Sequence, residues 1–142
     1  MNTEIIAAVA RATLAGSMSF PEVVSRLLEN GVEYYQVDYV ALQKRFYSST
    51  GEVVVTAINY KDLPAVARDF DTETVRAAIF DSQRNAQHYR DFTRRAMAAG
   101  VQGYAAFLRG KRVTYWGRQG DSHTEWFPGN SPISKTDSSA QA

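Results

Sequence analysis

Apolar positions recur at helical spacing in two stretches at the start of the chain. Between residues 3 and 15, apolar side chains fall on one face of a helix. A second helix is expected after Ser19, because Ser19-Phe20-Pro21-Glu22 has the order of a capping box. Gly31 can adopt the left-handed conformation that closes this helix. The first thirty residues therefore predict two amphipathic helices.

From residue 32 the spacing of apolar side chains changes to strict alternation. Tyr35, Val37 and Tyr39 share one face of the expected strand, and Tyr34, Gln36 and Asp38 share the other. Two more strands are expected over residues 42–47 and 52–58, separated by a turn that ends at Gly51. This stretch predicts a three-stranded antiparallel meander.

The same order of elements follows in the second part of the chain. An aspartate cap at Asp71 predicts a third helix, and a fourth begins near His88 and ends at Gly100. Three strands are expected after it, over residues 101–108, 112–117 and 122–127. Residues 129–142 are rich in Ser, Pro and Ala, and we expect a disordered tail there.

A shift of 69 residues aligns the two halves without a gap. The shift brings Gly31 onto Gly100, Tyr35 onto Tyr104 and Gly51 onto Gly120. Identical residues are few, so chance similarity between two helix-strand units remains the alternative.

The sequence thus predicts one α+β domain over residues 1–128. We expect two helix-helix-β-β-β units in pseudo-twofold tandem repeat, unit 1 over residues 2–58 and unit 2 over residues 71–127, joined by a connecting segment at 59–70. One three-stranded sheet is too small to hold a helix pair alone. The two sheets either join edge to edge into a six-stranded antiparallel sheet with helices on one face, or curl into a partly closed barrel.

Composition narrows the classes of chemistry open to the protein. The 142 residues include no cysteine, which excludes disulfides, thiolate metal sites and cysteine nucleophiles. The N-terminal stretch lacks the apolar core of a signal peptide, and no segment is apolar for long enough to span a bilayer. We therefore expect a cytoplasmic protein with no membrane partner.

Charge is distributed unevenly along the chain. Residues 1–83 carry seven basic and eleven acidic side chains, whereas residues 84–118 carry eight basic and one acidic. The basic segment indicates either an anionic partner or attraction between the two halves. Within it, Arg90, Arg94 and Arg112 are the candidate anion-binding residues. Nucleic-acid binding through this segment is a less favoured possibility.

Several segments of the sequence resemble a bacterial family of unknown function. They include Gly31-Val32-Glu33-Tyr34-Tyr35-Gln36-Val37-Asp38-Tyr39, Tyr115-Trp116-Gly117-Arg118-Gln119-Gly120 and Glu125-Trp126-Phe127-Pro128. The family is often labelled phage envelope protein and includes members in enterobacterial prophages. This resemblance implies a prophage-related protein, and it brings no catalytic residues with it.

Three acidic or imidazole side chains are the candidates for acid-base chemistry. Asp38 is an acid in an aromatic strand that otherwise disfavours it, and it could act as a base or orient a ligand. His123 and Glu125 are two residues apart in an expected strand and so point to the same side, where they could act as a base and its orienting carboxylate. Two ligands do not make a metal site, so we expect no metal centre and no cofactor.

Aromatic residues supply the candidate ligand-binding surface. Most of them are expected in the core, and Tyr34, Tyr47 and Trp116 are the candidates for lining a cleft between the two units. The favoured function is a small binding or regulatory module without catalysis, holding a small molecule in that cleft and forming a homodimer. A small enzyme using Asp38 or the His123-Glu125 pair is the alternative.

Overall fold

The computed structural model describes residues 1–130, which fold into four helices and one six-stranded antiparallel sheet. The helices are α1 (Thr3–Leu14), α2 (Phe20–Glu29), α3 (Thr72–Arg84) and α4 (Tyr89–Ala98). The strands are β1 (Val32–Asp38), β2 (Gln43–Ser48), β3 (Val53–Ala57), β4 (Val101–Phe107), β5 (Arg112–Gly117) and β6 (Ser122–Trp126). The predicted tail from residue 131 onward lies outside the described residues.

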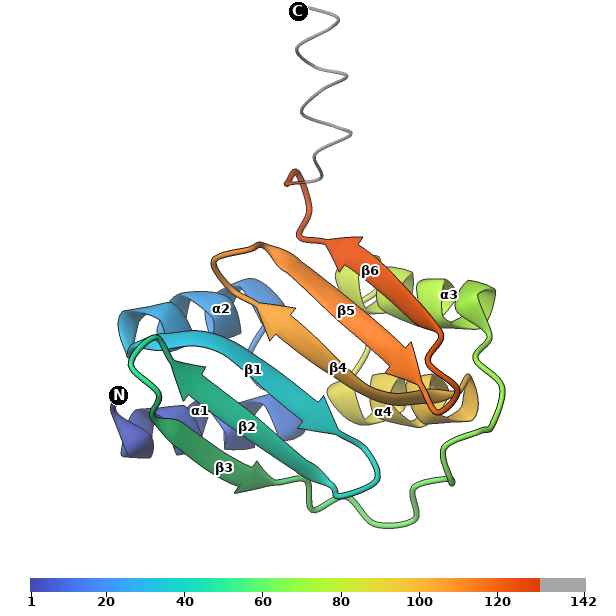
Figure 1. Ribbon diagram of the computed structural model, residues 1–142, viewed down its shortest axis with the longest axis horizontal. Helices are drawn as coiled ribbons and strands as arrows, with labels where there is room; N and C mark the ends of the chain where they lie inside the picture. The colour runs from blue at the N-terminus through green and yellow to red at the C-terminus, as the bar shows by residue number, and fades with distance from the viewer. Residues whose placement is uncertain (131–142) are drawn as a thin grey trace, which may run out of the picture.

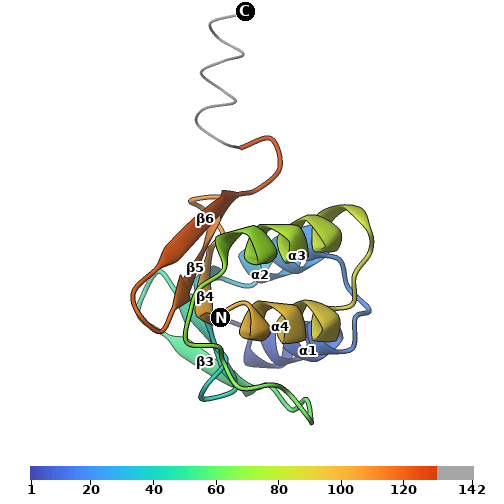
Figure 2. The same cartoon turned by 90° about the vertical axis from the view of Figure 1, so that its right-hand side faces the viewer.

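The helices cover one face of the sheet and leave the other face open. Strand order is β3-β2-β1-β4-β5-β6, so β1 and β4 join the two predicted three-stranded sheets edge to edge (Figure 1). All four helices lie on the same side of this sheet (Figure 2). The α+β class and the edge-to-edge arrangement are confirmed. The barrel alternative is wrong, because β3 and β6 remain free edges.

The helix ends follow the local signals in the sequence. Ser19 accepts a hydrogen bond from the backbone N–H of Glu22, whose carboxylate accepts from the backbone of Ser19, which completes the capping box. Asp71 caps α3 through the N–H of Thr74. Gly31 and Gly100 have φ of 87° and 96°, which lets the chain turn sharply from helix into strand. These local devices explain why the helix boundaries could be predicted closely.

The pairing registers of the two units coincide after the shift of 69 residues. Every β1–β2 partner pair, including the irregularity after its first pair, has its counterpart in β4–β5, and β2–β3 corresponds in the same way to β5–β6. In the central β1–β4 ladder, Gln36 pairs with Ala105, which is its own counterpart. The two units therefore have equivalent strand pairings in the fold. Descent of the two units from a duplicated ancestor stays a prediction.

Strand alternation determines which side chains form the core. The face of the sheet toward the helices carries Tyr35, Val37, Phe46, Tyr104 and Tyr115, all buried. The core extends across the junction of the units, because Tyr104 packs against both Tyr35 and Tyr39. The two units therefore share one hydrophobic core.

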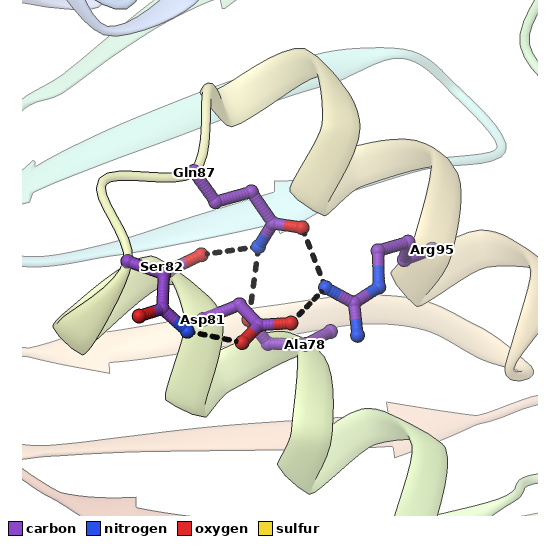
Figure 3. A network of polar contacts seen from close by, with 6 residues as sticks. Ala78, Asp81, Ser82, Gln87 and Arg95 are labelled. Atoms are coloured by element: carbon purple, nitrogen blue, oxygen red, sulfur yellow. Dashed lines mark hydrogen bonds and ion pairs between the residues drawn. The ribbon is translucent and has the colours of Figure 1, made fainter.

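A polar network connects α3 and α4 in unit 2 (Figure 3). The guanidinium of Arg95 donates to the Asp81 carboxylate at 2.6 Å and to the side-chain oxygen of Gln87 at 2.7 Å. The amide nitrogen of Gln87 in turn donates to the Ala78 carbonyl and the Ser82 hydroxyl. These bonds hold the turn between α3 and α4 against both helices.

Candidate functional site

An open cleft of about 900 Å³ lies on the helix side of the sheet. It lies between α1, the end of β3, the first residues of the connecting segment and the N-terminal half of α4. Its walls combine apolar, basic and other polar side chains, namely Ala7, Ala10, Arg11, Leu14, Ala15, Thr56, Ala57, Asn59, Tyr60, Lys61, Asp62, Arg90 and Arg94. A volume of this size accommodates a small organic molecule.

Positive charge dominates this cleft. Arg11, Lys61, Arg90 and Arg94 line it together with one carboxylate, that of Asp62. The four cations come from α1, the connecting segment and α4, which are distant in sequence and close in the fold. Such a concentration of cations in a concave site attracts anions.

The connecting segment is fixed in place by contacts from both sides. The hydroxyl of Tyr60 donates to the carbonyl of Leu14 at the end of α1, at 2.6 Å. The Arg90 guanidinium lies 5.2 Å from the centre of the Tyr60 ring, and Arg94 donates to the carbonyl of Asp62. Burial raises the pKa of Tyr60 to about 12, so this hydroxyl keeps its proton as a donor at neutral pH. The cleft is therefore shaped before any ligand enters.

Lys44 lies on the buried face of β2, beside the strand that forms part of this cleft's wall. Its side chain is only 3% exposed, and its strand partner Thr56 lines the cleft. The Lys44 ammonium lies 4.2 Å from the centre of the Tyr89 ring. Burial lowers the pKa of Lys44 to about 7. A substantial fraction of this amine is therefore neutral at physiological pH.

Buried tyrosine hydroxyls form a chain beside Lys44. The Tyr89 hydroxyl lies 2.7 Å from that of Tyr104 and 3.2 Å from that of Tyr39, which also approaches the hydroxyl of Thr93 at 3.5 Å. Burial raises the pKa values of Tyr89 and Tyr104 well above their usual value and that of Tyr39 to about 12. These hydroxyls stay neutral, so they supply no counter-charge to Lys44, whose ammonium contacts the Tyr89 ring.

A second, smaller cleft of about 350 Å³ lies at the equivalent place in unit 2. It is lined by Glu73, Arg76, Ala77, Ile79, Phe80, Gln83 and Glu125. His123 and Glu125 lie on the same side of β6, as their spacing predicts, with His123 Nε2 and Glu125 Oε2 2.8 Å apart. Glu125 reaches the rim of the smaller cleft, and a catalytic role for the pair stays a prediction.

Asp38 occupies the open face of the sheet, at the end of β1. Its carboxylate oxygen accepts from the backbone N–H groups of Val40 and Ala41 and from the side-chain amide of Gln102. Gln102 also accepts from the indole N–H of Trp116 at 2.6 Å. Asp38 therefore organises the β1–β2 turn, and it lines neither cleft.

The structure separates the other candidate residues onto two faces. Tyr34 and Tyr47 stack on the open face, with ring centres 4.7 Å apart, so with Trp116 they are absent from the walls of both clefts. Strand alternation places them there, whereas the clefts form on the helix face. Arg90 and Arg94 meet in the larger cleft, while Arg112 stacks on Trp126 at 4.1 Å on the open face.

Sequence reasoning missed Lys44, Thr56, Tyr60 and Lys61. A signal for Lys44 was present, because alternation in β2 places it on the same side as the apolar Phe46. The contribution of Tyr60 and Lys61 had no such signal, since the connecting segment has no periodicity.

No helix within residues 1–130 has the length and apolar content needed to cross a membrane. No functionally curated protein matches the sequence. Residues 9–124 match the family described as "Protein of unknown function (DUF1398)". Because the match covers both units almost completely, the chain belongs to this DUF1398 family.

Proposed function

We propose that this protein binds a small organic anion in the larger cleft and acts as a small-ligand binding module. The observation that carries the proposal is the excess of cations there, four basic side chains against the single carboxylate of Asp62. Guanidinium groups bind carboxylates and phosphates through charge-assisted, often bidentate hydrogen bonds. Arg90 and Arg94 were already candidate anion-binding residues on sequence grounds, and both line this cleft.

The apolar part of the cleft supports an organic ligand rather than a bare inorganic ion. Ala7, Ala10, Leu14 and Ala15 form a wall of small apolar side chains along α1. A ligand with a short carbon skeleton can cover this wall while its charged group faces Arg90 and Arg94. The smaller cleft does not share this chemistry, because its charged residues are Arg76, Glu73 and Glu125.

The proposal is tested by calorimetric titration of the whole protein with pyruvate, lactate, citrate and inorganic phosphate, at low and high salt. We expect saturable binding of at least one organic acid that weakens as salt screens the cations. Replacing both Arg90 and Arg94 by Gln should weaken this binding by about tenfold or more, since two charge-assisted contacts are lost.

Two variants serve as matched controls. Arg112→Gln removes a cation from the open face, and Arg76→Gln removes one from the smaller cleft, so neither should change the affinity. The proposal fails if no organic acid binds at low salt, or if the Arg90/Arg94 double variant binds as tightly as the parent protein. A relation to prophages and self-association are separate predictions and form no part of it.

A further inference from the structure

Lys44 has surroundings that a structural lysine rarely has. Its side chain is buried, and within residues 1–130 it makes no ion pair and no hydrogen bond. The contact of its ammonium is with the π-face of Tyr89. Buried lysines are normally paired with a carboxylate, because an unpaired buried charge is unfavourable.

The fold does not require a cation at this place. Val113 is the counterpart of Lys44 in unit 2, in the same register of the same ladder and also buried. An apolar side chain therefore satisfies the backbone and packing at this position. A polar group kept where an apolar one fits indicates a use beyond folding.

Lys44 lies one strand away from the wall of the larger cleft. Thr56, its partner in the β2–β3 ladder, lines the cleft, and the Thr56 hydroxyl is buried without a hydrogen-bond partner in the described residues. Tyr60, also in the cleft wall, has its ring centre 6.4 Å from that of Tyr89, the ring beneath the ammonium. Lys44 does not itself line the cleft, so contact between its amine and a ligand requires side chains of the cleft wall to move.

We propose that Lys44 is a nucleophile that captures a small oxo acid from the larger cleft as an imine. This inference rests on the proposed function and names its ligand class. Arg90 and Arg94 hold the carboxylate, and the ketone or aldehyde carbon of the same molecule faces the amine. Desolvation without a counter-ion keeps much of the amine neutral, which is the reactive form.

The chemistry requires no oxidant or further reactant. The lone pair of Lys44 Nζ attacks the carbonyl carbon and forms a C–N bond, while the carbonyl oxygen takes up a proton to give a carbinolamine. The nitrogen lone pair then forms the C=N bond of the imine as the C–O bond breaks, and the oxygen leaves as water that carries the two hydrogens of the former amine. We assign the hydrogen bond to the carbinolamine oxygen to the hydroxyl of Thr56, the strand partner of Lys44, because this hydroxyl has no other partner among the described residues.

Reductive trapping tests the inference directly. The whole protein is incubated with pyruvate and cyanoborohydride near pH 8, and the modified lysine is located by peptide mass mapping. The sequence has four lysines, Lys44, Lys61, Lys111 and Lys135, so each site can be followed separately. We expect Lys44 to be labelled at least tenfold faster than the exposed Lys111.

Lys44→Met and Lys111→Met form the matched pair of variants. Lys44→Met should abolish the rapid labelling, and Lys111→Met, which removes an exposed lysine that lines neither cleft, should leave labelling of Lys44 in place. Methionine is apolar and of similar length, so the Lys44 variant should fold, which thermal unfolding checks. Equal labelling of all lysines, or labelling of Lys61 ahead of Lys44, overturns the inference.

Lactate separates failure of the inference from failure of the proposed function. It has the carboxylate of pyruvate and lacks the carbonyl, so it should bind the cleft and slow the trapping of Lys44 without being trapped. Binding of both acids that depends on Arg90 and Arg94, with Lys44 unlabelled, overturns the inference and leaves the proposed function standing. Rapid labelling of Lys44 that is unchanged in the Arg90/Arg94 double variant overturns the route through the cleft.

Discussion

Units 1 and 2 place different side chains on equivalent positions of the same backbone. Where unit 1 turns Lys44 and Thr56 toward the helices, unit 2 turns Val113 and Glu125. Where α2 begins with Phe20, α4 begins with Tyr89. Element bounds and strand registers hardly differ, yet one cleft is large and basic and the other small and mixed in charge.

The comparison shows that scaffold and chemistry are specified by different residues. Caps, turn glycines and strand alternation recur in both units and determine the backbone. The cleft and Lys44 depend on residues that occur in one unit, and on the connecting segment that only one cleft contacts. The two halves can therefore be compared residue by residue.

The largest difference in stability between equivalent variants is expected at the glycines between the second helix and first strand of each unit. An alanine Cβ at Gly100 would lie 2.2 Å from the Asp69 carbonyl oxygen, whereas one at Gly31 would meet only Met1, at 3.5 Å or more. Both glycines have positive φ, which costs a non-glycine residue about 1–2 kcal/mol. Overlap with backbone adds about as much again at Gly100.

Gly100→Ala should therefore lower the free energy of unfolding by about 3 kcal/mol, and Gly31→Ala by about 1 kcal/mol. Denaturant titration of both variants measures the difference. The backbone around Asp69 cannot easily retreat, since Asp71 N–H donates to the Ala99 carbonyl at 2.8 Å and Ala67 N–H to that of Met97 at 3.0 Å. Equal losses in the two variants would mean that the connecting segment yields, and would contradict this packing.

The next difference concerns the response of stability to pH. The pKa of Lys44 falls from its ordinary value in the unfolded chain to about 7 in the folded protein. Between these values the unfolded chain binds more protons, so stability rises with pH above 7. From pH 7 to pH 9 this contribution amounts to about 2 kcal/mol.

Lys44→Met should remove this rise, whereas Lys111→Met, at an exposed position of unit 2, should keep it. Denaturant titrations at pH 7, 8 and 9 supply the comparison. The range stops below pH 10, because the raised pKa values of Tyr39, Tyr89 and Tyr104 act in the opposite direction once tyrosines of the unfolded chain ionise. Persistence of the full rise in Lys44→Met would show that another group carries it.

The distinction between residues that determine the backbone and residues that form the cleft also explains which features could be predicted from the sequence. Elements determined by local signals could be predicted from the sequence. Examples are the capping box at Ser19, the cap at Asp71 and the alternation through β1. The edge-to-edge sheet was one of two arrangements left open, because pairing of β1 with β4 depends on contacts between segments about 70 residues apart. Periodicity alone cannot choose between them.

The candidate site could be predicted from the sequence only in part, for a physical reason. Arg90 and Arg94 were identified from charge, but their cleft is completed by Tyr60, Lys61 and Asp62, in a segment held by hydrogen bonds to α1 and α4. The burial of Lys44 depends on Tyr89 from the other unit. Such relations between distant segments leave no pattern along the chain.

A smaller difference is expected between equivalent arginines of α2 and α4. Arg95 on α4 donates to Asp81 on α3 and to Gln87 in the turn between them, whereas Arg26, its counterpart on α2, is exposed. Its partner Asp81 is partly exposed, so solvent screens their attraction. Arg95→Ala should lower the melting temperature by a few degrees and Arg26→Ala should leave it unchanged. A comparable drop in both variants would remove the polar network of Figure 3 as the cause.

The smallest difference is expected at the turns that precede β3 and β6. Gly51 and Gly120 have φ of 88° and 91°, and an added Cβ would meet nothing within 4 Å at either place. Backbone strain alone then decides the effect, so Gly51→Ala and Gly120→Ala should each cost about 1 kcal/mol and differ by less than the error of a denaturant titration. Because both turns lie far from the clefts, neither variant should alter anion binding. Unequal losses of stability would mean that the two turns differ in how well their backbone accommodates a non-glycine residue. The two units would then differ in their backbone as well as in the side chains of the larger cleft.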